Sequence, residues 1–119
     1  MAYGFAKTEF EPYAAEWDKT KHFPIDQYKK AADLGFGGIY VSEDYGGCGL
    51  GRLEASLIFE ALATGCVGSS AYLSIHNMCA WMVDTYGSKE LKDKYLHSMT
   101  KFDLFSSYCL TEPDSGSDA

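Results

Sequence analysis

A helix with apolar side chains on nearly every face is predicted for the run from Ser69 to Tyr86. Such a helix is stable only when other parts of the protein cover it. Its most apolar part, Ala71 to Val83, is too short to cross a bilayer and is interrupted by Ser74, His76 and Asn77. We therefore expect no membrane span, but a central helix with other elements packed around it.

Four further segments have apolar residues at three- to four-residue spacing, which predicts an amphipathic helix over 9–17, 24–34, 53–64 and 88–100. Pro24 suits a first helical position, Gly35 a C-terminal cap, and Ser88 an N-cap. The side chains expected to face the core are Phe10, Tyr13, Ala14, Trp17, Ile25, Tyr28, Ala31, Ala32, Leu57, Ile58, Ala61, Leu62, Leu91, Tyr95 and Met99.

The pattern changes near the C-terminal end of the sequence. From Phe105 the run SSYCLTE has the half-alternating, β-prone character of a strand, and DSGSD is typical of a tight turn. No hydrophobic segment follows, so the rest of any sheet would come from further chain. We predict an all-α helical-bundle domain over residues 1–104, followed at 105–119 by the opening strand of a β-domain.

Charge excludes two classes of partner. The net charge is -7, and Arg52 is the only arginine among ten basic residues. Nucleic acids and anionic membrane surfaces are bound mainly through basic patches, so we expect neither as a partner. A phosphate group would be held by lysine, by backbone N–H groups or by residues outside this sequence.

Three patterns resemble functional motifs but have a structural explanation that we favour. In GGCGLG, Gly46 to Gly51, the third glycine of a dinucleotide-binding turn would fall on Arg52, so we expect a structural loop. His76 and Cys79 have helical metal-ligand spacing, but no second pair completes a site, so we predict no metal and a buried, hydrogen-bonded histidine. The four cysteines form no CxxC pair, which indicates reduced thiols in an intracellular protein.

The segment Tyr108 to Ser117 is the strongest candidate for binding. It combines a strand edge, the hydroxyls of Thr111 and Ser117, the flexible Gly116 and successive N–H groups in a turn. Such a turn can hold an anion or the polar edge of a flat ring. The same residues are also compatible with a solvated loop, and their chemistry alone leaves both readings open.

The stretch CLTEPDSGSD, Cys109 to Asp118, resembles the signature of the acyl-CoA dehydrogenase family at every fixed position. That signature runs small, aliphatic, Ser/Thr, Glu, two variable residues, small, Gly, Ser/Thr, Asp. The stretches SEDYGGCGLG, FEALATGC and GSKELKDKYL are similar to segments at corresponding places in the family's N-terminal helical domain. The resemblance therefore covers the chain from about Glu9 onward.

This resemblance implies an enzyme that binds FAD between the helical domain and a middle β-domain. A glutamate takes the α-proton of an acyl thioester, a hydride passes to the flavin, and electron-transfer flavoprotein reoxidises it. The family's glutamate lies in a C-terminal helical domain beyond Ala119, so we expect no catalytic residue here and no activity from this piece alone. The resemblance also implies a homotetramer in the mitochondrial matrix, although no transit or signal peptide is visible in Met1 to Phe10.

Within the family, RLEASLIFEALATGC and AYLSIHNMCAWMVDTYG are most similar to the branch that converts isobutyryl-CoA to methacrylyl-CoA in valine catabolism. The alternatives are a dehydrogenase for 2-methylbutyryl-CoA or butyryl-CoA, and a non-catalytic helical interaction module. The family assigns Glu112 a structural role, and Asp114 is expected to face solvent because a carboxylate beside pyrophosphate is unfavourable.

Carried over residue by residue, the resemblance gives two sets of candidate site residues. Those expected to contact FAD are Tyr108, Cys109, Leu110, Thr111, Glu112, Pro113, Asp114, Ser115, Gly116 and Ser117. Those expected to contact acyl-CoA are Ser117 and, on the central helix, Ser70, Ser74, Ile75 and Met78.

Overall fold

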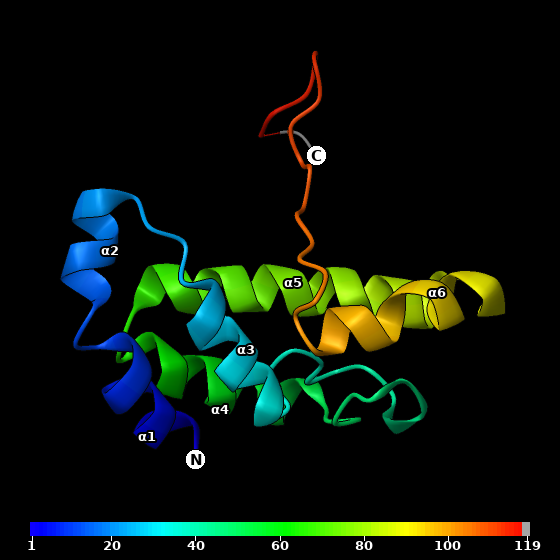
Figure 1. Ribbon diagram of the computed structural model, residues 1–119. Coiled ribbons are helices and arrows are strands. Elements are labelled where there is room, and N and C mark those ends of the chain that lie inside the picture. Colours follow the sequence, from blue (N-terminus) through cyan, green and yellow to red (C-terminus); the bar gives the residue numbers. More distant parts are fainter. Residues whose placement is uncertain (118–119) are drawn as a thin grey trace.

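The computed structural model describes residues 1–117 and shows a bundle of helices from which the C-terminal segment stands away (Figure 1). No strand occurs within residues 1–117, so the all-α prediction is confirmed, and no helix in that range is both long and apolar enough to span a bilayer. The elements are α1 (Ala2–Phe5), a π-helical turn η1 (Ala6–Phe10), α2 (Ala14–Thr20), α3 (Ile25–Asp33), a 3-10 turn η2 (Glu43–Tyr45), α4 (Arg52–Ala63), α5 (Val67–Tyr86) and α6 (Lys89–Thr100).

The prediction of one helix over 9–17 is wrong. The chain is helical from Ala2 to Phe10, turns at residues 11–13, and starts a new helix at Ala14. Pro12 lies in the turn, and its missing N–H cannot continue the helical hydrogen-bond ladder. Tyr13 is consequently exposed and stacks on Trp17, with ring centroids 5.6 Å apart, instead of entering the core.

The predicted helix ends are correct elsewhere. Helix α3 starts directly after Pro24, and Gly35 follows its end with a φ of 84°, a conformation that favours glycine. Helix α6 starts after Ser88, whose hydroxyl accepts a hydrogen bond from the Leu91 N–H at 3.3 Å. These boundaries depend on local backbone chemistry, which explains why the sequence revealed them.

The prediction that the central helix is buried on all sides is wrong. Helix α5 packs on α4 and α6, and its buried residues lie on one side of the helix. Three of the large apolar side chains on its other faces, Tyr72, Met82 and Tyr86, are exposed. The buried side is partly polar, and it consists of Ser69, Ser70, Leu73, His76, Asn77 and Ala80.

Two apolar clusters hold the helices together. The larger contains the rings of Phe5, Phe10, Tyr28, Phe36 and Phe102, several of them in edge-to-face pairs such as Phe5 and Phe10 at 5.2 Å. Edge-to-face pairs contribute about 0.5–1.5 kcal/mol beyond their area burial. The smaller cluster joins the glycine-rich loop to α5 and α6 and consists of Val41, Ala80, Leu96 and Met99.

Polar side chains of α5 hold the glycine-rich loop, residues 35–51, against the bundle. The Asn77 side chain accepts from the Ile39 N–H at 2.6 Å and donates to the Phe36 carbonyl at 2.8 Å. Farther along α5, Asp84 accepts from the N–H of Ser42 at 2.8 Å. A dense set of loop contacts of this kind supports the structural interpretation of GGCGLG.

Besides Tyr13, three side chains predicted to face the core, Ile25, Leu57 and Leu91, are exposed. In α6 the buried residues are Leu96, Met99 and Thr100. The spacing of apolar residues identifies a helix, but a short helix with few apolar positions has more than one possible inward face. Contacts of α6 with α5 and η2 select the observed one.

Candidate functional site

The segment after α6 leaves the bundle through a sharp turn at Phe102. This residue has a φ of 55°, which is uncommon for a side chain of its size, and only 1% of its surface is exposed. Its ring is 4.3 Å from that of His76, and the N–H groups of Asp103 and Leu104 donate to the Ser98 carbonyl. The aromatic cluster therefore fixes the direction in which the segment starts (Figure 1).

Two side chains of α5 hold the segment where it passes the helix. The Nε2 of His76 is 2.9 Å from the Met99 carbonyl oxygen. The Nδ1 of the same ring lies 3.2 Å from the Ser106 backbone nitrogen and 2.9 Å from its hydroxyl. One turn along, the Cys79 thiol donates to the Ser107 carbonyl at 3.6 Å. The pair considered as metal ligands therefore contacts two consecutive residues of the departing chain.

His76 matches the prediction of a buried, hydrogen-bonded histidine, since 2% of its surface is exposed. A backbone carbonyl can only accept and a backbone N–H can only donate. The ring therefore carries its proton on Nε2 and accepts through Nδ1. Burial lowers the pKa of His76, which favours this neutral form.

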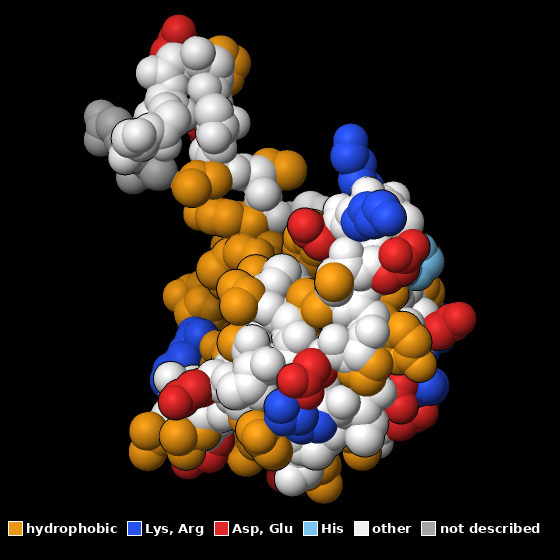
Figure 2. All heavy atoms as spheres, turned by 90° about the vertical axis from the view of Figure 1, so that its left-hand side faces the viewer, with side chains coloured by type: hydrophobic (Ala, Val, Ile, Leu, Met, Phe, Trp, Pro, Cys, Tyr) orange, Lys and Arg blue, Asp and Glu red, His pale blue; other side chains and the backbone are white. Residues whose placement is uncertain are grey.

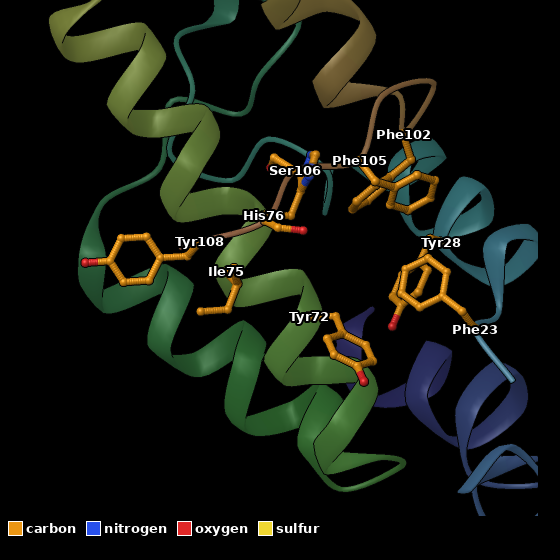
Figure 3. Close-up of a pocket in the computed structure, with 10 residues that line it drawn as sticks. Phe23, Tyr28, Tyr72, Ile75, His76, Phe102, Phe105, Ser106 and Tyr108 are labelled. Atoms are coloured by element: carbon orange, nitrogen blue, oxygen red, sulfur yellow. Dashed lines mark hydrogen bonds between the residues drawn. The ribbon is translucent and has the colours of Figure 1, made fainter. Parts of the chain in front are cut away.

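A hollow of about 490 Å³ lies between α5 and the departing segment (Figure 3). Figure 2 shows hydrophobic side chains gathered on the surface where the segment leaves the bundle. The lining is mainly aromatic, with a few polar groups, an arrangement that suits an apolar or flat ligand. It consists of Phe23, Tyr28, Tyr72, Ile75, His76, Phe102, Phe105, Ser106, Ser107 and Tyr108.

The segment ends in a tight turn that is closed by its own backbone. Glu112 and Ser115 pair in an antiparallel bridge, and their N–H groups donate to each other's carbonyls at 2.8 and 3.2 Å. Asp114 is exposed, as are most residues of this segment, and its orientation relative to a cofactor stays a prediction. Residues 105–111 are extended but form no strand within the described chain, so the domain division at 104/105 stays a prediction. Asp118, the last signature residue, lies outside the described residues.

The backbone of the segment offers hydrogen-bond donors. Within residues 1–117, the N–H groups of Tyr108, Cys109, Leu110 and Thr111 have no protein acceptor. The Thr111 and Ser117 side chains are exposed. Free N–H groups that begin at the edge of an aromatic hollow can donate to the polar edge of a flat ring such as the isoalloxazine of FAD.

The residues predicted to contact the acyl chain do not share one hollow. Ile75 lines the hollow beside Tyr108, whereas Ser70 and Ser74 line a second one of about 530 Å³ between α4 and α5. The Ser70 hydroxyl donates to the Phe59 carbonyl at 3.1 Å, and Met78 is half-buried beside neither hollow. Their role in substrate binding stays a prediction.

The second hollow contains the single arginine. Arg52 contacts two aromatic rings, with its guanidinium 4.3 Å from the centroid of Tyr40 and 4.5 Å from that of Trp81. Cation–π contacts with both rings stabilise the position of the guanidinium. Sequence reasoning missed this cluster, because its three members are far apart in the chain.

Sequence reasoning also missed the aromatic lining contributed by Phe23, Tyr28, Phe102 and Phe105. Their residue numbers show no common period, and only folding brings them together. On α5, by contrast, Tyr72, Ile75, His76 and Cys79 recur at helical spacing, so one side of the hollow carried a readable signal.

Comparison with known proteins matches both the helices and the segment. Isobutyryl-CoA dehydrogenase, mitochondrial, of Bos taurus is 55% identical over 119 residues, as is the protein of the same name from Dictyostelium discoideum. These alignments cover 100% of this chain and 29% of each relative. A solved FAD complex of PigA superposes with a TM-score of 0.90 at 39% identity, over 98% of this chain and 31% of that one.

The family model described as acyl-CoA dehydrogenase, N-terminal domain, matches residues 1–103, which is the whole helical bundle. The signature that first indicated this relationship, Cys109 to Asp118, lies beyond the matched range. The chain therefore belongs to the acyl-CoA dehydrogenase family, and its bundle is that family's N-terminal domain.

Proposed function

We propose that this chain forms the helical wall and one flavin edge of an enzyme that dehydrogenates the α,β-bond of a short branched-chain acyl-CoA. The observation that carries the proposal is the run of free N–H groups that starts at Tyr108, on the edge of the aromatic hollow, and continues to Thr111. Identity of 55% with proteins named isobutyryl-CoA dehydrogenase favours isobutyryl-CoA as substrate and methacrylyl-CoA as product. The names of both relatives include the word mitochondrial, which favours the mitochondrial matrix as the location of this protein.

FAD fits the donors of the segment, and when bound it would accept the hydride from the β-carbon of the substrate. The N–H groups of residues 108–111, together with Thr111 and Ser117, would hold the ring edge and ribityl side. The aromatic side chains would keep water away from the reacting carbons. In the family-based proposal, the base that takes the α-proton is a glutamate outside this sequence.

The net charge of -7 bears on the CoA moiety. Arg52 is the only arginine among ten basic residues, so this chain offers few bidentate partners for CoA phosphates. We infer that residues outside it bind the adenosine end, and that electron-transfer flavoprotein and a homotetrameric assembly complete the system. Butyryl-CoA and 2-methylbutyryl-CoA are the competing substrates.

The test uses the full-length polypeptide that carries this chain, purified and assayed with isobutyryl-CoA, 2-methylbutyryl-CoA and butyryl-CoA. We expect visible flavin absorbance and the highest kcat/KM with isobutyryl-CoA. A preference for butyryl-CoA would refute the branched-chain assignment. A colourless protein whose melting temperature does not change on addition of FAD would refute the enzyme and favour a non-catalytic helical module.

A further inference from the structure

The departing segment touches α5 at two consecutive residues, Ser106 and Ser107, which lie just before the donors at 108–111. The Nδ1 of His76 accepts from both the N–H and the hydroxyl of Ser106, and the Cys79 thiol donates to the carbonyl of Ser107. Beyond these contacts, residues 108–111 have no hydrogen bond to the bundle within the described chain. Any displacement of Ser106 is therefore passed on to the donors that follow it.

We propose that His76 is a positioning residue that sets where the flavin-edge segment starts, acting as a neutral imidazole between Met99 and Ser106. This inference rests on the proposed function and deepens it, because His76 acts through Ser106 rather than by touching the flavin edge. Met99 lies in the last turn of α6 and belongs to the smaller apolar cluster. The Met99 carbonyl fixes the proton on Nε2, and the ring belongs to α5, so the histidine ties the start of the segment to the buried side of that helix.

Only one protonation state of His76 can make both contacts. A proton on Nδ1 would face the Ser106 N–H, and two donors cannot bond to each other. The groups that face the ring are the Met99 carbonyl at the end of α6, the rings of Phe102 and Phe105, and Ser106. Tyr28 of α3 shares the hollow, and burial raises the pKa of its hydroxyl, so it too is neutral. A protonated ring would deprive the Ser106 N–H of its acceptor and would keep only a donation to the Ser106 hydroxyl oxygen, besides the weak thiol contact of Cys79.

Two neutral substitutions separate the two halves of this contact. The amide oxygen of asparagine lies as many bonds from Cβ as Nδ1 does, so His76→Asn keeps an acceptor for Ser106 and loses the donor to Met99. The amide nitrogen of glutamine corresponds in the same way to Nε2, so His76→Gln keeps the donor to Met99 and loses the acceptor for Ser106. Each variant loses one side of the link, which makes them matched controls for a general loss of stability.

The test measures amide hydrogen exchange at Ser106 and the Kd for FAD, in the full-length polypeptide and both variants. We expect His76→Gln to accelerate Ser106 exchange about tenfold, the effect of losing one hydrogen bond, and to weaken FAD binding several-fold. His76→Asn should stay within about twofold of wild type in both measurements. Lowering the pH below about 6.5 should accelerate Ser106 exchange in wild type, after correction for intrinsic rates, but not in His76→Asn.

Failure of the proposed function and failure of the positioning role of His76 would give different results. Wild-type protein that binds no FAD overturns the proposed function and with it the role of His76 toward a flavin. If wild type binds FAD and the two variants change Ser106 exchange and FAD affinity equally, the histidine only contributes to stability and the positioning role is overturned. Normal FAD affinity in His76→Gln despite faster Ser106 exchange also overturns it.

Discussion

Asn77 is fully buried on the inner side of α5, and its amide group is used completely. Its oxygen accepts from Ile39, while its nitrogen donates to the carbonyls of Phe36 and, within the helix, Leu73. The side chain thereby satisfies backbone groups of a loop that lie far from water. A buried backbone group left without a partner costs about 1–3 kcal/mol.

Replacing Asn77 by alanine should therefore lower the free energy of unfolding by about 3 kcal/mol, because two backbone groups of the loop lose their partners. Urea denaturation measures this loss. Ser74→Ala is the matched control on the same helix, since the Ser74 hydroxyl donates only to the Ala71 carbonyl one turn back. Equal losses in both variants would show that the amide does not hold the loop.

We expect titration of His76 to make the stability of the fold depend on pH. Burial lowers its pKa in the folded state below the ordinary value of 6.5, so the unfolded chain takes up the proton first. Stability from this group is complete above pH 6.5 and is lost as the pH falls from 6.5 toward the lower folded pKa. Thermal melts between pH 7.5 and 5 should show a steeper decline for wild type than for His76→Asn. Parallel curves would exclude His76 as the cause.

At the scale of elements, the glycine-rich loop is shaped by how closely two parts of its backbone approach each other. A Cβ on Gly47 would lie 2.1 Å from the Val41 carbonyl oxygen, a separation that no relaxation of a side chain can relieve. On Gly68, in the first turn of α5, a Cβ would meet no atom within 4 Å. The same substitution should therefore act in opposite directions at these two positions.

We expect Gly47→Ala to lower the free energy of unfolding by more than about 2 kcal/mol, and Gly68→Ala to leave it unchanged or raise it by up to about 1 kcal/mol, as alanine does in helices. Chemical denaturation of both variants provides the comparison. A stable Gly47→Ala protein would mean that the loop can open without cost.

Helix α6 begins with a side-chain cap that the sequence predicted. Loss of the Ser88 hydroxyl in Ser88→Ala should cost about 1 kcal/mol and lower the melting temperature by several degrees. Ser88→Asp keeps an acceptor for the Leu91 N–H and should remain close to wild type. If the aspartate variant melts as early as the alanine variant, the hydrogen bond is not what starts the helix.

At the scale of the whole molecule, the bundle and the departing segment differ in how firmly they are held. The bundle has two apolar clusters, whereas residues 108–117 are mostly exposed, and none of their N–H groups donates to the bundle as far as the structure describes the chain. Segments with few buried contacts open most easily and are cut first by proteases.

Brief chymotrypsin treatment of the 119-residue chain should therefore cleave first beside Tyr108 or Leu110. The first of these side chains is aromatic, the second is aliphatic, and both are exposed. Mass spectrometry should then show a resistant core that contains α1 to α6, which would support the division at 104/105. First cuts inside the loop at 35–51 would contradict the rigidity inferred from its contacts to α5.

The sequence predicted four of the five helices to within about two residues, the caps at Gly35 and Ser88, and the family through its signature. These features depend on residues within a turn or two of each other, so local chemistry specifies them. The same locality explains the misplaced first helix, because the spacing of apolar residues from Phe10 to Trp17 continues across Pro12, where the helix breaks.

Tertiary structure decided which side of α5 is buried, where Leu91 points, and what His76 does. His76 and Ser106 are 30 residues apart, and Asn77 and Ile39 are separated by 38, so no periodicity relates the members of either pair. Such contacts form only when several helices close around one another, and their energy comes from satisfying buried polar groups in that closed state. The sequence by itself therefore determined the helices and pointed to the candidate binding segment, and only the packed bundle determined how that segment is held against the helices.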